Sequence, residues 1–137
     1  MVDVDRLEAV LIAAARARRT LTYAEVLRFF GTTITPRRVY GLCRDLGEVC
    51  RRSRERGEPE LAVLVVRRSD RLPGEGFFAG ERRRGVYAGP STGPEAASFV
   101  HAETARAFDY WAGARPSAAG PARPGPDPEA PAAFRSR

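Results

Sequence analysis

The stretch LTYAEVLRFFGTTITPRRVYGLCRDLGEVC, residues 21–50, decides the fold. Thr22 and Glu25 have the spacing of a capping box, in which each side chain bonds the other residue's backbone N–H at the start of a helix. A short helix is therefore predicted to begin at Tyr23 and to end at Gly31, because glycine readily adopts the left-handed conformation that ends helices. The side chains of this helix expected in the core are Val26, Leu27, Phe29 and Phe30.

A longer helix is predicted next, with Thr35 as its capping residue, Pro36 at its first position and its end near Arg56. Its apolar residues recur at three- and four-residue steps and predict one buried stripe: Val39, Leu42, Cys43, Leu46, Val49 and Cys50. The outward face carries Arg37, Gly41, Arg44, Glu48, Arg51 and Glu55. Because the glutamates have the spacing of ion pairs within a helix, this face fits a solvated surface as well as a binding surface.

Further elements are predicted on both sides of this pair of helices. Residues 3–18 have the periodicity of an amphipathic helix, and a capping box around Pro94 opens a last helix that runs to about Ala112. Residues 61–66 are rich in valine and leucine without helical spacing, which predicts a buried strand. Phe77 and Phe78 begin a second extended segment, so residues 61–78 are predicted to form a β-hairpin with arginines at its tip.

The predicted fold class is mostly α with a small β-hairpin: a winged helix-turn-helix-like single domain over residues 1–112. Residues 81–89 are expected to form a surface loop or a short strand. Residues 113–137 hold six of the 11 prolines and hardly any large apolar residue. Such a segment cannot bury enough surface to offset its ordering entropy, and we expect a disordered tail.

The charge of the chain favours a polyanionic partner. The 137 residues carry a formal net charge of +6, and all 23 basic residues are arginine. The planar guanidinium suits phosphates and guanine edges, although a GC-rich genome produces the same arginine bias. No apolar run approaches the roughly 20 residues of a membrane span, and no signal peptide is recognisable, so a cytoplasmic protein without membrane contact is expected.

Residues that could support catalysis or metal binding are few. Cys43 and Cys50 lie seven residues apart on one predicted helix, about 10 Å along its axis, which is too far for a disulfide. His101 is the only histidine, so the usual tetrahedral zinc sets cannot be assembled. We therefore expect no catalytic residue, no metal and no cofactor.

The predicted nucleic-acid surface combines the long helix with the hairpin. In a winged helix-turn-helix the third helix enters the major groove and the wing contacts the backbone. DNA is the expected partner, and RNA is possible on the same charge argument. The predicted contact residues are Thr35, Arg37, Arg38, Tyr40, Arg44, Arg51, Arg67, Arg68 and Arg71.

Residues 21–41 resemble the DNA-binding domain of O6-alkylguanine-DNA alkyltransferases and alkyltransferase-like proteins. The matching segments are LTYAEV at residues 21–26 and RVYG at residues 38–41. The resemblance implies that Tyr23 contacts the phosphate of a flipped nucleotide and that Arg38 fills the gap in the base stack. Residues 60–67 read ELAVLVVR where that family has its Pro-Cys-His-Arg acceptor loop, so alkyl transfer is excluded.

Two functions follow from these patterns. The first is a small non-catalytic DNA-binding protein, regulatory or repair-associated. The alternative is a protein-interaction module, an adaptor, inhibitor or accessory subunit, because aromatic residues are frequent interface anchors. The aromatic residues available for that role are Phe77, Phe78, Tyr87, Phe108, Tyr110 and Trp111.

Overall fold

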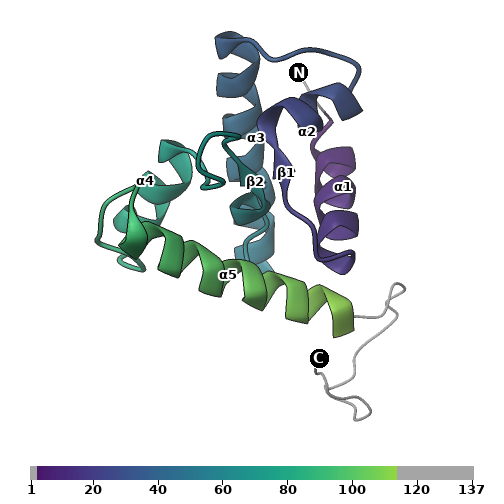
Figure 1. The fold of residues 1–137 in the computed structure, drawn as a ribbon. Coiled ribbons are helices and arrows are strands. Elements are labelled where there is room, and N and C mark those ends of the chain that lie inside the picture. The colour runs from purple at the N-terminus through teal and green to yellow at the C-terminus, as the bar shows by residue number, and fades with distance from the viewer. Residues whose placement is uncertain (1–2, 114–137) are drawn as a thin grey trace.

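The computed structural model describes residues 3–113 (Figure 1). The prediction of a mostly helical chain with a small β element is confirmed, and the order of the first three helices is compatible with a helix-turn-helix. The predicted tail lies outside the described residues, apart from Gly113. In chain order the elements are α1 Val4–Arg16, β1 Leu21–Thr22, α2 Tyr23–Phe29, α3 Pro36–Glu55, the 3-10 helix η1 Ala62–Leu64, β2 Val65–Val66, α4 Glu75–Arg83 and α5 Pro94–Gly113.

The capped starts predicted for α2 and α3 are confirmed. The Thr22 hydroxyl accepts a hydrogen bond from the Glu25 N–H at 3.1 Å, and the Thr22 N–H donates to the Glu25 carboxylate at 2.8 Å. At the start of α3 the Thr35 hydroxyl accepts from the Arg38 N–H at 3.2 Å, with Pro36 in the first turn. These local bonds fix where the chain turns before α2 and α3.

The predicted hairpin at residues 61–78 is wrong. The two strands of the described chain are parallel, with Leu21 opposite Val65 and Thr22 opposite Val66. Phe77 and Phe78 belong to helix α4, which also takes in the first part of the expected loop at residues 81–89. Helical geometry lets Phe78 enter the core, and this burial outweighs the low helix propensity of a glycine- and phenylalanine-rich segment.

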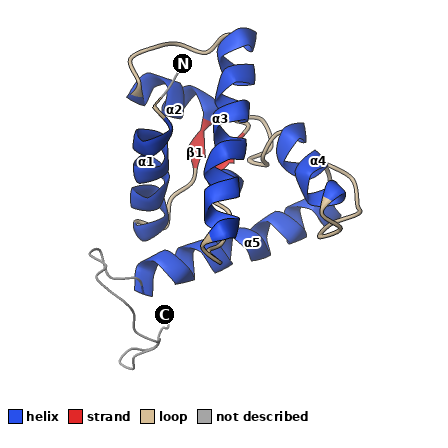
Figure 2. Cartoon of the chain, turned by 180° about the vertical axis from the view of Figure 1, so that it is seen from behind, coloured by secondary structure: helices blue, strands red, loops and turns tan. Residues whose placement is uncertain are grey.

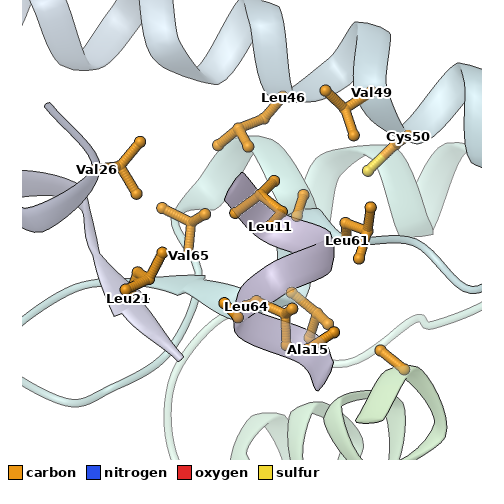
Figure 3. Close-up of a cluster of buried hydrophobic side chains, with 14 of the residues drawn as sticks. Leu11, Ala15, Leu21, Val26, Leu46, Val49, Cys50, Leu61, Leu64 and Val65 are labelled. Atoms are coloured by element: carbon orange, nitrogen blue, oxygen red, sulfur yellow. The ribbon is translucent and has the colours of Figure 1, made fainter. Parts of the chain in front are cut away.

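The core lies where α1, α3 and the strand pair meet. Its side chains come from each helix and strand between α1 and β2. Figure 3 shows Leu11, Val26, Leu46, Leu61 and Val65 pointing toward one another. Helix α5 crosses the ends of α1 and α3 that lie opposite the α2–α3 turn (Figures 1 and 2). The first turns of α3 extend beyond α1 and α2 in both views, so this end of α3 stands clear of the other helices.

Candidate nucleic-acid interface

Helix α3 has two halves of different charge. Residues 26–44, which span the end of α2, the turn and the first half of α3, contain four arginines and no acidic residue. Residues 45–60 contain four arginines and five acidic residues. The arginine-bearing face predicted from the sequence is therefore not one uniform surface.

The second half of α3 has its arginines paired with carboxylates. Arg51 binds Glu48 in a two-pronged ion pair, with nitrogen–oxygen distances of 2.6 and 2.9 Å, and also binds Glu55. The Arg51 guanidinium lowers the pKa of Glu48 to about 2. Three neighbouring arginines also form ion pairs with carboxylates: Arg52 with Asp5 at 2.6 Å, Arg54 with Glu60 at 3.0 Å, and Arg56 with Glu8 and Glu58. Arg51, predicted to contact nucleic acid, is committed to these internal pairs.

The first half of α3 keeps its positive charge. Arg37 is exposed and makes no ion pair with any residue from 3 to 113, and the same holds for Arg28 at the end of α2. Arg38 donates to the Thr33 hydroxyl and carbonyl, both at 3.0 Å, and these neutral acceptors leave its charge uncompensated. Arg44 is also exposed, while Thr35 is occupied as the cap of α3.

Large apolar side chains are exposed at the same end of the molecule. Tyr40 is 72% exposed, Phe29 56% and Ile34 53%. The prediction that Phe29 enters the core is wrong, because α2 directs Tyr23, Val26 and Leu27 inward and Phe29 lies on another side of this short helix. We call the combined surface the α2–α3 end, and it comprises Arg28, Phe29, Ile34, Arg37, Arg38, Tyr40 and Arg44.

The three arginines predicted at a wing tip lie in the loop between β2 and α4. Arg67 forms a two-pronged ion pair with Asp70 at 3.0 and 3.1 Å, and Arg71, whose backbone has a positive φ of 60°, donates to the Thr20 hydroxyl at 2.8 Å. These two side chains hold the loop in shape. Arg68 is exposed and has no ion pair inside the described part of the chain, so it is the available cation of this loop.

Tyr23 does not lie on the surface. Its side chain is 8% exposed, and its hydroxyl oxygen accepts a hydrogen bond from the Gly74 N–H at 2.9 Å. Burial raises the pKa of Tyr23 to about 12. The phosphate contact predicted for Tyr23 is therefore wrong, because its buried hydroxyl joins the start of α2 to the loop before α4.

Replacing Tyr23 by phenylalanine tests this structural role. The change leaves the Gly74 N–H without its acceptor, and we expect the free energy of unfolding to fall by about 1–3 kcal/mol, measured by chemical denaturation. DNA affinity at a temperature where the variant is folded should not change. Tyr40→Phe, at an exposed position, is the control and should alter stability by less than about 0.5 kcal/mol. Equal stability of Tyr23→Phe and the wild type would contradict the role assigned to this hydroxyl.

The aromatic residues of the protein-interaction alternative lie mostly inside the protein. Phe78, Tyr87 and Trp111 are buried, and Phe77 and Phe108 are partly buried against the core. The rings of Tyr87 and Phe99 stack with their centroids 4.4 Å apart. Only Tyr110 of the six is exposed, so these residues do not form a continuous outer surface.

A cleft of 130 Å³ separates α3 from α4, with Tyr23, Cys43, Cys50 and Glu60 among its lining residues. Burial raises the pKa of Cys43, and burial together with the nearby Glu60 charge raises that of Cys50 to about 12. Both thiols are therefore protonated at neutral pH, and the cleft offers no thiolate nucleophile. Within residues 3–113 no three His, Cys, Asp or Glu side chains gather closely enough to hold a metal ion.

No protein-family model, curated protein or solved structure matches this chain. The resemblance to alkyltransferase DNA-binding domains thus stays a prediction based on residues 21–41. Among the helices of residues 3–113, none combines the length and the apolar character needed to cross a membrane.

Proposed function

We propose that this chain is a small, non-catalytic, cytoplasmic DNA-binding protein, regulatory or repair-associated, which contacts DNA through the α2–α3 end. One observation carries the proposal. The arginines of residues 45–60 are paired with carboxylates, whereas Arg28, Arg37 and Arg38 on residues 26–44 are exposed and have no acidic partner within the described residues. A polyanion is the partner that compensates such a group of charges.

The shape of this end supports the same conclusion. The first turns of α3 project beyond the neighbouring helices, and the major groove, about 12 Å wide, admits one α-helix. In helix-turn-helix proteins the residues near the start of the second helix of the motif contact base edges. Arg37 and Arg38 occupy this part of α3, and Arg68 offers a further cation from the β2–α4 loop.

Gly41 is compatible with this placement, as is Gly47 further along α3, where an added Cβ likewise meets nothing within 4 Å. Gly41 lies on the outward face of α3 between Arg37 and Arg44, and a Cβ added there would meet nothing within 4 Å. The fold therefore does not require glycine at this position, although a glycine inside a helix lowers stability by roughly 0.5–1 kcal/mol relative to alanine. A backbone without a side chain allows another molecule to approach α3 closely.

Fluorescence anisotropy with a labelled DNA duplex at 50 and 200 mM salt tests the proposal. We expect affinity to fall steeply with salt, because bound counterions are released from the phosphates. The double variant Arg28→Ala/Arg37→Ala should bind at least about tenfold more weakly and lose about 2 from the log–log salt slope. Gly41→Ala should be as stable as the wild type or more so, yet bind more weakly.

Arg51→Ala and Arg106→Ala, tested singly and combined as a charge-matched double variant, are the controls. Arg51→Ala removes a cation of the same helix that Glu48 and Glu55 already compensate, and Arg106→Ala removes one paired with Glu103 on α5. Each control should change affinity by less than about threefold. Absence of binding at micromolar protein and low salt, or equal losses in the controls and in Arg28→Ala/Arg37→Ala, would overturn the proposed function.

A further inference from the structure

The exposed apolar residues of the α2–α3 end are more than a phosphate-binding surface requires. Five large hydrophobic side chains are exposed among residues 3–113, and three of them, Phe29, Ile34 and Tyr40, lie on this end. Arginines alone can bind phosphates, and hydrogen-bonding side chains read base edges in a groove. An exposed aromatic ring among these arginines points to contact with the face of a base.

Tyr40 has the ring that is most open to such a contact. It has no aromatic neighbour and no cation over its ring within the described residues. Two partly exposed rings are covered by a guanidinium: Arg6 lies 5.3 Å from the Phe30 ring centre, and Arg18 lies 6.0 Å from that of Phe108. The exposed Phe29 ring contacts that of Phe30, with centroids 6.5 Å apart. The face of Tyr40 is therefore free for a partner.

The position of Tyr40 on α3 places it beside a cation. Arg37 precedes Tyr40 by three residues, and residues with this spacing lie next to each other on a helix surface. A base stacked on Tyr40 would have its neighbouring phosphate within reach of the Arg37 guanidinium. Alternating aromatic and cationic contacts of this kind are typical of proteins that bind single strands.

We propose that the α2–α3 end binds unpaired nucleotides, with the Tyr40 ring stacked on a base and Arg37 on an adjacent phosphate. This inference rests on the proposed function and adds to it: the end of the molecule proposed to contact duplex DNA binds strands with accessible base faces more tightly. In an intact duplex each base face is covered by its neighbours in the stack, so Tyr40 has no stacking partner there. The acid-free sequence of residues 26–44 favours a polyanion over an apolar protein groove as the occupant of this surface.

The test measures anisotropy at 50 mM salt with three labelled 12-nucleotide probes: a DNA single strand, its duplex, and an RNA strand of the same sequence. We expect one or both single strands to bind at least about tenfold more tightly than the duplex. Tyr40→Ala should lower single-strand affinity roughly tenfold and leave duplex affinity within about twofold, because stacking on one base is lost. Tyr40→Phe keeps the ring and should bind like the wild type.

Tyr110→Ala is the matched control, since Tyr110 is 42% exposed on α5, outside the α2–α3 end, and its loss should not affect binding. Equal or tighter binding of the duplex, or equal losses in Tyr40→Ala and Tyr110→Ala, would overturn the inference. Duplex binding that depends on Arg28 and Arg37 would then still support the proposed function. Binding to none of the three probes would refute both.

Discussion

Replacing Phe78 by alanine is expected to lower the free energy of unfolding by about 3–5 kcal/mol, one of the two largest effects we predict for a single substitution in this chain. Phe78 is 0% exposed. Its ring meets that of Phe77 edge-on at 5.3 Å between centroids and lies 5.7 Å from that of Tyr87. The substitution removes these contacts and leaves a cavity between α4 and the rest of the core, so both the transfer free energy and the packing are lost.

Urea denaturation of Phe78→Ala, Phe78→Leu and Val86→Ala checks this prediction. Leucine refills part of the space and should cost clearly less than alanine. Val86 is 55% exposed only eight residues further on, and its replacement should change stability by less than about 0.5 kcal/mol. If Phe78→Ala costs no more than Val86→Ala, α4 is not packed on the core as described.

Stability and the proposed binding are expected to depend on different residues of this chain. Phe78 is a residue of α4 whose side chain packs in the core, whereas the α2–α3 end includes the first turns of α3, which project beyond α1 and α2 (Figure 1). A folded sample of Phe78→Ala should therefore keep its nucleic-acid affinity, while Arg28→Ala/Arg37→Ala should keep its stability. The residues that hold the fold and those proposed to bind are different sets.

The parts of the fold that the sequence predicts correctly depend on local interactions. The capping box of Thr22 and Glu25 joins residues three positions apart, and the Thr35 cap reaches Arg38. Such bonds form in any chain with these residues at this spacing, so the starts of α2 and α3 are readable without the tertiary structure.

The errors arise where distant segments decide the conformation. The pairing of Leu21 with Val65 joins residues far apart in sequence, and only two residues on each side take part. Local composition at residues 61–66 indicates a strand but does not reveal its partner, its direction or the 3-10 turn of Ala62–Leu64. The helix at Phe77 and Phe78 depends in the same way on packing against the rings of Tyr87 and Phe99.

The same distinction between local and long-range interactions applies to the candidate site. Helical periodicity predicts the outward direction of Arg37, Arg44 and Arg51, and the spacing of Glu48 and Glu55 already indicates the intrahelical pairs of Arg51. The pairing of Arg52 with Asp5 and of Arg56 with Glu8 depends on the packing of α1 against α3, for which the sequence carries no local signal. The exposure of Phe29 and Ile34 likewise follows from the length of α2 and the path of the turn.

The second large effect concerns Arg84, the cation between two carboxylates near the α3–α4 cleft. Arg84 donates to Glu81 at 3.0 Å and to Glu60 at 3.2 Å. Glu81 is 4% exposed, and its burial together with the Glu60 charge raises its pKa. Arg84→Ala leaves two neighbouring carboxylates without this cation, and we expect it to lower the free energy of unfolding by about 2–4 kcal/mol at pH 8.

The loss should depend on pH in a direction set by Glu81. Because its pKa in the folded protein lies above that of the unfolded chain, protonated Glu81 favours folding, and this contribution is lost as pH rises through the folded-state pKa. Without Arg84 that pKa rises further, so the cost of Arg84→Ala should be small near pH 4 and largest at pH 8.

Two further variants test this explanation. Adding Glu81→Gln to Arg84→Ala should restore most of the stability. Arg83→Ala, at an exposed neighbour without an ion pair among residues 3–113, should cost little at any pH. Urea denaturation of these variants at pH 4, 6 and 8 measures the free energy of unfolding that each change costs. If the cost of Arg84→Ala is the same at every pH, or if Glu81→Gln restores no stability, Arg84 stabilises α4 by packing and not by compensating the charges of Glu60 and Glu81.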